Sequence, residues 1–309
     1  MAKATNAFDT YTATANREEL ADVIYNISPA DTPVLSAAGK KNVNNVTFDW
    51  QTDQLQANDA TGVLEGDDIT ADATPATTRE SNVCQINRVT ARSTGSQEAS
   101  DAAGMTSLLA YSMSLRAKEL KRNMETAICG KQNKTSGSAT VARATRGIES
   151  WLSTNASRGT SGANSSGAVT DGTQRAFTEA LLKPVLKSCF DEGAEPTMLV
   201  VGGFNKQAVS GFTGRSNARA MIDENTASNS VDVYISDFNT LNVVPSRFSR
   251  ARSGLILDAN MISIAYLRDF ETFDLAKTSD SSAKAMIVEF GVCMHNEAGH
   301  GIVADLTTS

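Results

Sequence analysis

The longest periodic pattern in the chain predicts one long helix over residues 97–129. Apolar side chains recur there at steps of three or four positions, which is the spacing of one face of an α-helix: Met105, Leu109, Met113, Ala117, Leu120, Met124 and Ile128. At ~1.5 Å per residue, such a helix would be roughly 48 Å long. Gly130 follows its last turn, where a glycine commonly ends a helix.

A second pattern, which alternates every two residues, predicts a β-hairpin. In residues 46–51, Val46, Phe48 and Trp50 alternate with polar residues, as in a strand with two unlike faces. We expect residues 82–91 to form the returning strand. Residues 42–78 contain no Lys or Arg, so the hairpin is predicted to be negative; its seven acids are Asp49, Asp53, Asp59, Glu65, Asp67, Asp68 and Asp72.

Weaker patterns place a polar arm before the hairpin and an α/β unit and strands after it. The arm, residues 1–45, has one predicted helix, which Asn16 caps and Ser28-Pro29 ends. Residues 153–173 have the composition of a flexible loop or a domain boundary. Helices are predicted at 176–192 and 205–212, and strands at 198–201, 231–235, 241–244, 255–257, 261–266 and 285–294. The predicted fold class is therefore α+β.

Composition and charge exclude several classes of protein. The chain has 309 residues, with 28 Lys+Arg against 35 Asp+Glu and a pI near 5.0, which argues against a protein whose main task is to bind nucleic-acid phosphates. It shows neither the apolar core of a signal peptide nor an apolar run of ~18 residues, so we expect a soluble chain that is not exported and does not enter a membrane. The four cysteines are far apart, and we expect them to be reduced and mostly buried: Cys84, Cys129, Cys189 and Cys293.

The search for catalytic or metal-binding patterns gives little. His295 and His300 bracket Glu297 but lack the helical spacing of a zinc site, so we interpret them as turn histidines. Gly202-Gly203 is better explained by a tight turn than by a phosphate loop. The acids from Glu65 to Asp72 do not match a calcium loop, which favours an acidic contact surface. We therefore predict no enzyme, no cofactor and no metal site.

Five stretches resemble the major capsid protein of tailed double-stranded DNA bacteriophages, which has the Hong Kong ninety-seven-type fold. They lie from the arm to the C-terminal strands and together span nearly the whole chain: Ile27-Ser-Pro-Ala-Asp-Thr-Pro-Val34, Phe48-Asp-Trp-Gln-Thr-Asp-Gln-Leu55, Arg146-Gly-Ile-Glu-Ser-Trp151, Val200-Val-Gly-Gly-Phe-Asn-Lys206 and Val288-Glu-Phe-Gly-Val292. The order of predicted elements is also similar to that of the family. The nearest alternative is an encapsulin, a protein nanocompartment shell of the same fold, and an alternative of another class is a glycan-binding tail or surface adhesin.

The resemblance implies a division of the chain and a function. The implied parts are an N-arm (1–45), an extended E-loop hairpin (46–92), a peripheral P-domain with the spine helix 97–129 and the Ser/Gly-rich loop (93–174), an axial A-domain (175–244) and C-terminal P-domain strands (245–309). The implied function is self-assembly, as hexamers and pentamers, into the icosahedral virion head around phage DNA, with assembly in the host bacterial cytoplasm. The implied partners are other copies of the chain, a portal protein, a scaffolding protein and a decoration protein, with only weak contact to DNA. Since no long helical scaffolding segment precedes the arm, we expect a separate scaffold or none.

Charge suggests which surfaces meet between subunits. We expect the hairpin acids of one subunit to lie over basic helix residues of the next, with these candidates: Asp59, Glu65, Asp67, Asp68 and Asp72 against Arg116, Lys118, Lys121 and Arg122. A further group of cations after the helix is expected to face solvent, with DNA or a neighbouring subunit as alternatives: Lys131, Lys134, Arg143, Arg146 and Arg158.

Overall fold

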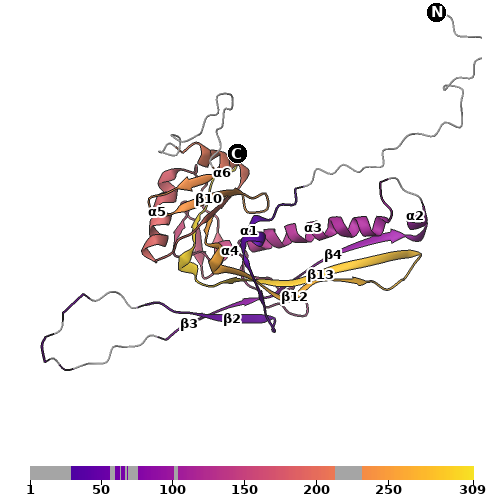
Figure 1. Ribbon diagram of the computed structural model, residues 1–309, viewed down its shortest axis with the longest axis horizontal. Helices are drawn as coiled ribbons and strands as arrows, with labels where there is room; N and C mark the ends of the chain where they lie inside the picture. The colour runs from indigo at the N-terminus through magenta and orange to yellow at the C-terminus, as the bar shows by residue number, and fades with distance from the viewer. Residues whose placement is uncertain are drawn as a thin grey trace, which may run out of the picture.

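The chain folds around two sheets, and a two-stranded hairpin extends away from both (Figure 1). The computed structural model describes residues 29–55, 60–62, 64–66, 68, 76–100, 104–212 and 232–309. The predicted helix capped by Asn16 lies outside the described residues. In Figure 1, the hairpin and the long four-stranded sheet point in opposite directions along the longest axis, so the molecule is elongated.

The four-stranded sheet has the order β1-β12-β13-β4. Its strands are β1 (Gly39–Asn42), β4 (Gln85–Thr94), β12 (Ile262–Asp274) and β13 (Ser281–Met294). β13 pairs antiparallel with both β12 and β4, and β1 lies parallel to β12. Helix α3 (Leu108–Ile128) lies along this sheet and packs mainly on β4 and β13 (Figure 1). The short helix α1 (Pro33–Ala37) lies against α3.

Helix α3 begins later than the sequence pattern predicted. It has 21 residues, or about 32 Å at 1.5 Å per residue, because the chain forms a separate short helix α2 (Gly95–Ala99) before it. Gly104 has a φ of 78°, which is not helical, and the Ser107 hydroxyl caps α3 by accepting a hydrogen bond from the Ala110 amide. The Glu98 carboxylate, at the end of α2, accepts hydrogen bonds from the Ser107 hydroxyl and the Leu109 amide. The predicted start at residue 97 is therefore wrong, whereas the apolar face from Leu109 to Ile128 is confirmed.

The second sheet has six strands in the order β5-β14-β11-β8-β10-β9. They are β5 (Ala156–Ser157), β8 (Met198–Val201), β9 (Val233–Ile235), β10 (Thr240–Pro245), β11 (Gly254–Leu257) and β14 (Gly301–Val303). All four residues of β8 and of β11 are buried, because one face packs on α5 (Glu179–Asp191) and the other joins the core under α3. This double burial explains their uninterrupted apolar sequences. The 3₁₀ turns η2 (Ala259–Met261) and η3 (Glu297–Gly299) and the helices α4 (Ile148–Trp151) and α6 (Gly203–Ser210) complete the body.

The hairpin has a different returning strand from the one that the sequence predicted. β2 (Thr47–Thr52) pairs with β3 (Thr78–Val83), whereas residues 85–94 form β4 and pair with β13. The chain changes partner at Cys84, whose amide donates to the Val46 carbonyl. β3 is half exposed and mostly polar, so its sequence lacks the alternation that identified β2.

Residues 153–173, predicted to be a flexible loop, are instead tied into the body. They contain β5 and the small hairpin of β6 (Ala163–Ser165) and β7 (Ala168–Thr170). The other predicted helices and strands are confirmed with shifted ends, and the four cysteines are buried and reduced, as expected. Among the described helices, none has the length and hydropathy needed to cross a membrane.

Candidate assembly surfaces

The root of the hairpin is fixed in the core by aromatic packing. One face of β2 is buried and carries Phe48 and Trp50, whose rings stack with centroids 5.9 Å apart. The Trp50 ring lies 5.4 Å from the ring of Trp151 in α4, and the Arg146 guanidinium lies 3.9 Å from the centroid of Trp151. A Cβ atom at Gly291 would come within 2.6 Å of the Phe48 ring, so β13 needs a glycine where the hairpin crosses it.

Asn82, at the end of β3, adds a set of hydrogen bonds that fixes the root. Its side chain is fully buried and donates to the Val292 carbonyl at 2.7 Å and to the Thr145 hydroxyl at 3.1 Å. Its carbonyl oxygen accepts from the Arg146 amide at 2.9 Å. Because all these partners belong to the body, the hairpin is held at a defined angle to it.

Beyond this root, the described hairpin residues are exposed. Leu55 and Leu64 are 99% and 83% exposed, and both Glu65 and Asp68 are exposed as well. The other candidate acids, Asp59, Asp67 and Asp72, lie outside the described residues. Isolated exposed leucines are common on protein surfaces, and these two are apolar side chains that another chain could cover.

The four candidate cations on α3 do not form one uniform surface. Arg116 pairs with Glu119 on the same helix at 2.6 Å, and the Arg122 guanidinium lies 5.8 Å from the centroid of the Phe248 ring. Lys118 and Lys121 are exposed, and neither has an ion pair with another described residue. These two lysines are therefore the candidates best placed to bind acids of a neighbouring chain.

A buried carboxylate attaches the end of the arm to α3. Glu125 is fully buried, and its two oxygens accept hydrogen bonds from the amides of Val34 at 3.0 Å and Leu35 at 2.8 Å. These are amides of the first turn of α1, which lack partners within the helix. Burial raises the pKa of Glu125, and the two amide hydrogen bonds oppose that rise. The contact fixes the position at which the arm leaves the body.

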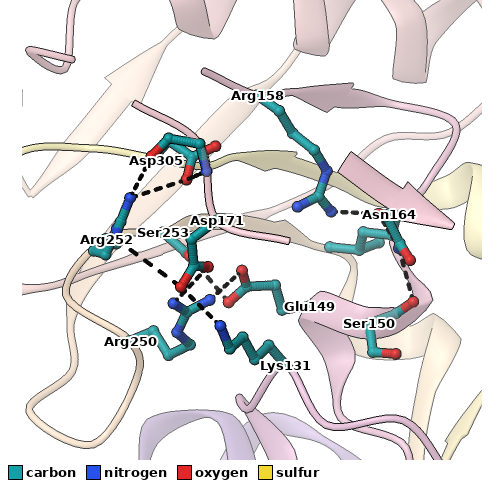
Figure 2. Close-up of polar contacts among 12 residues, drawn as sticks. Lys131, Glu149, Ser150, Arg158, Asn164, Asp171, Arg250, Arg252, Ser253 and Asp305 are labelled. Atoms are coloured by element: carbon teal, nitrogen blue, oxygen red, sulfur yellow. Dashed lines mark hydrogen bonds and ion pairs between the residues drawn. The ribbon is translucent and has the colours of Figure 1, made fainter. Parts of the chain in front are cut away.

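The cations after α3 have partners within the chain. Lys134 is exposed, as expected, whereas Lys131, Arg143, Arg146 and Arg158 are only partly exposed. Lys134 donates to the Ser81 carbonyl at 3.2 Å, and Arg143 pairs with the buried Glu289 at 3.4 Å. Arg158 donates to the Leu152 carbonyl at 2.9 Å. Arg146 and Lys131 are engaged too, the former on Trp151 and the latter in the cluster shown in Figure 2.

The centre of that polar cluster is a buried carboxylate. Glu149 of α4 is 1% exposed and accepts from Arg250 at 2.6 Å and from the Ser253 hydroxyl at 3.0 Å (Figure 2). Arg250 also donates to Asp171 at 2.9 Å, and Lys131 reaches the same carboxylate at 2.7 Å. Partial burial would raise the pKa of Asp171, but its hydrogen bonds with the two cations outweigh burial and lower it to about 2.

Asp305 extends the cluster to the C-terminal end of the chain. Its carboxylate accepts from the Gly159 amide at 3.0 Å, the Gly172 amide at 2.7 Å and Arg252 at 3.2 Å. Two glycine amides of the 153–173 segment, 13 residues apart, are thus bound to one buried side chain. The cluster joins α4, this segment and the loop before β11, so it fixes the six-stranded sheet relative to the core under α3.

The two histidines have structural partners. His300 is fully buried and accepts from the Asp258 amide at 3.1 Å, and His295 is hydrogen-bonded to the Ser263 hydroxyl at 2.8 Å. Burial lowers the pKa of His300 to about 4. Within the described residues, no group of three or more His, Cys, Asp or Glu side chains is placed to hold a metal ion.

Comparison with known proteins gives a family match over nearly the whole chain. The SU10 major capsid protein family matches residues 4–307. The major capsid protein of Escherichia phage Phieco32 is 31% identical over 129 residues, which are 41% of this chain and 37% of that protein. The chain therefore aligns with little more than a third of the length of this curated relative.

Solved capsid structures share the fold. The capsid of a native GTA particle matches with a TM-score of 0.66 at 13% identity, covering 97% of this chain and 100% of the other. A structure of phage G gp27 major capsid proteins with gp26 decoration proteins matches with a TM-score of 0.54 at 10% identity, covering 99% and 100%. These likenesses show the Hong Kong ninety-seven-type capsid fold, as the sequence predicted.

Proposed function

The chain belongs to the SU10 major capsid protein family, and we propose that it self-assembles through hexamers and pentamers into an icosahedral phage head around double-stranded DNA. The hairpin β2–β3 carries the proposal. Its root is packed and hydrogen-bonded to the body, while Leu55 and Leu64 farther out are exposed apolar side chains. A two-stranded hairpin is only marginally stable alone, so a neighbouring copy that covers it supplies the missing contacts.

The family match favours this function over the protein nanocompartment and the glycan-binding adhesin. The acidic net charge of −7 supports a shell that contacts its DNA only weakly. We assign residues 1–45 to an N-arm, 46–92 to the E-loop, whose last residues enter β4 of the four-stranded sheet, 175–244 to the A-domain and the remainder to the P-domain. The six-stranded sheet with α5 supports the A-domain assignment in part, but β5, β11 and β14 of that sheet lie outside residues 175–244.

Assembly is tested by purifying the full chain without partners and examining it by negative-stain electron microscopy and sedimentation. Closed shells or rings of subunits are expected, and particles recovered from infected cells should show the absorbance of DNA. A monodisperse monomer at every concentration and salt would contradict the proposal. Shells that contain a protein cargo and no nucleic acid would support the nanocompartment instead.

Between subunits, we propose that the hairpin acids bind the exposed Lys118 and Lys121 of the next α3, with Arg116 and Arg122 contributing less because they have partners in their own chain. Complementary charge would mainly fix register, and apolar burial would supply most of the affinity. Asp67→Lys with Asp68→Lys should lower the yield of shells at low salt. Adding Lys118→Glu and Lys121→Glu should restore part of it.

The matched control is Glu195→Lys, which changes the charge of an exposed acid far from the hairpin in sequence. It should leave the yield near that of the wild type. Unchanged yield in the hairpin variant, or no recovery in the combined variant, would contradict the proposed pairing but not the shell itself.

We also propose the family's accessory partners for this chain: a portal protein, a scaffolding protein and a decoration protein, with assembly in the host bacterial cytoplasm. The phage G structure, whose capsid proteins carry decoration proteins, supports the last of these by analogy of fold. Mass spectrometry of purified virions is the test, since each partner should appear as a further protein in fixed proportion to the shell protein.

A further inference from the structure

An apolar groove runs beside α3 on the four-stranded sheet. Because α3 packs mainly on β4 and β13, the side of β12 next to it is left open. Two adjoining cavities of about 510 and 370 Å³ lie there and share Ala117 and Met286 in their walls. The first is lined by residues of α1, α3 and β12, including Leu35, Tyr266 and Phe270. The second continues toward the start of α3, at Leu109 and Met113.

The charged residues on the walls of the groove are mostly basic. Lys40 and Lys121 line the first cavity together with Asp269, and Lys284, which pairs with Asp274 at 3.5 Å, lines the second. Two lysines against one acid make the first cavity basic, which favours an occupant that combines an apolar face with negative charge.

One segment of this chain has that chemistry and is within reach. Residues 17–27 place Leu20, Val23, Ile24 and Ile27 at helical spacing, and they carry three acids against one cation. We propose that this segment docks as an amphipathic helix in the groove of its own chain.

The dimensions support docking within one chain. The described chain begins at Pro29, three residues before Thr32, which lines the first cavity. A helix of eleven residues is about 16 Å long, and the stretch of α3 from Ser107 to Lys121 that borders the groove is about 21 Å long at 1.5 Å per residue. A leash of a few residues also gives the segment a high effective concentration at its own groove, which favours it over the same segment of a neighbouring copy.

Chemical cross-linking of the full chain tests the contact. In Val23→Cys/Ala117→Cys, a short bismaleimide should give an intramolecular product, while the four native cysteines are buried and do not react. The matched control, Val23→Cys/Asn123→Cys, places the second thiol on an exposed part of α3 that does not line the groove, and it should react at least about tenfold less. Equal yields in the two variants would overturn the proposal.

A mixing experiment separates the chain's own segment from a neighbour's. When the single variants Val23→Cys and Ala117→Cys are co-assembled or mixed as subunits, docking within one chain predicts no cross-linked dimer. A dimer would overturn the proposal in favour of exchange between copies. The cross-linking yield does not depend on shell formation. The docking proposal can therefore be contradicted while the chain still forms shells, and it can be supported while the chain forms none.

Limited proteolysis gives a second measurement without added thiols. Ala117→Arg fills the groove, so trypsin should cut after Arg17 at least about tenfold faster than in the wild type, because the segment is displaced. Asn123→Arg adds the same side chain off the groove and should cut at the wild-type rate. Equal cutting in both variants would contradict the docking.

Discussion

Removing the cation from the buried Glu149–Arg250 pair should strongly destabilise the subunit. Glu149 is 1% exposed, and Arg250→Met would leave its carboxylate with the Ser253 hydroxyl as its remaining side-chain partner among the described residues. Breaking a buried ion pair by removing one partner costs about 3–5 kcal/mol, since the other charge stays buried and uncompensated. The same change also removes the contact with Asp171, which is more exposed and adds less.

Urea unfolding of the unassembled full chain, followed by tryptophan fluorescence, measures this cost. Glu149→Gln combined with Arg250→Met removes both charges, so the double variant should be more stable than Arg250→Met alone and lose only about 1–2 kcal/mol against the wild type. Lys187→Met is the control, because it breaks an exposed pair with Asp191 and should cost less than about 0.5 kcal/mol. A loss below about 1 kcal/mol in Arg250→Met, or strictly additive losses in the double variant, would refute the reasoning.

Three further changes test other contacts. Glu125→Gln should cost about 1–3 kcal/mol and speed hydrogen exchange at the first amides of α1, whereas Glu119→Gln on the exposed face should do neither. Burial lowers the pKa of His300 to about 4 in the folded chain, against 6.5 in the unfolded chain, so the folded state must bury a charged ring or lose it to the unfolded state as the pH falls. The free energy of unfolding should therefore fall by about 3 kcal/mol as the pH drops from 6.5 to 4, and His300→Gln should lack this part of the pH dependence. Gly291→Ala should cost about 1–3 kcal/mol, because its Cβ would meet an aromatic ring of the hairpin root at 2.6 Å. Gly203→Ala, whose Cβ would meet nothing within 4 Å, should be nearly neutral in the same denaturation assay.

Sequence periodicity predicted the elements whose burial is regular. The apolar face of α3 and the alternation of β2 are visible because one side of each element is buried along its length. β3 was missed because it is mostly polar and half exposed. The start of α3 depends on Glu98 and Ser107, a contact between two elements that periodicity does not reveal.

The candidate surfaces were predicted less completely than the fold. The cations after α3 look like ordinary surface residues in the sequence, yet Lys131, Lys134 and Arg143 bind carboxylates or carbonyls at least 40 residues away. Glu149 and Arg250 are 101 residues apart, and one sequence does not show that they meet. The sequence offered one sign of this contact, which is the pair Arg250 and Arg252 just before the buried strand β11. Cations next to a buried strand need partners for their charge.

The change of partner at Cys84 makes the hairpin a lever whose angle is set at its root, where Asn82 binds the body. β2 has six residues and is therefore about 20 Å long, so a tilt of about 10° at its root moves its far end by roughly 3.5 Å, close to the rise of one residue along a strand. A displacement of one residue would turn the opposite face of an extended segment toward any surface it meets. The buried side-chain amide of Asn82 and the close approach at Gly291 therefore limit how far the hairpin can tilt. They thereby limit which residues of a neighbouring subunit the hairpin can meet.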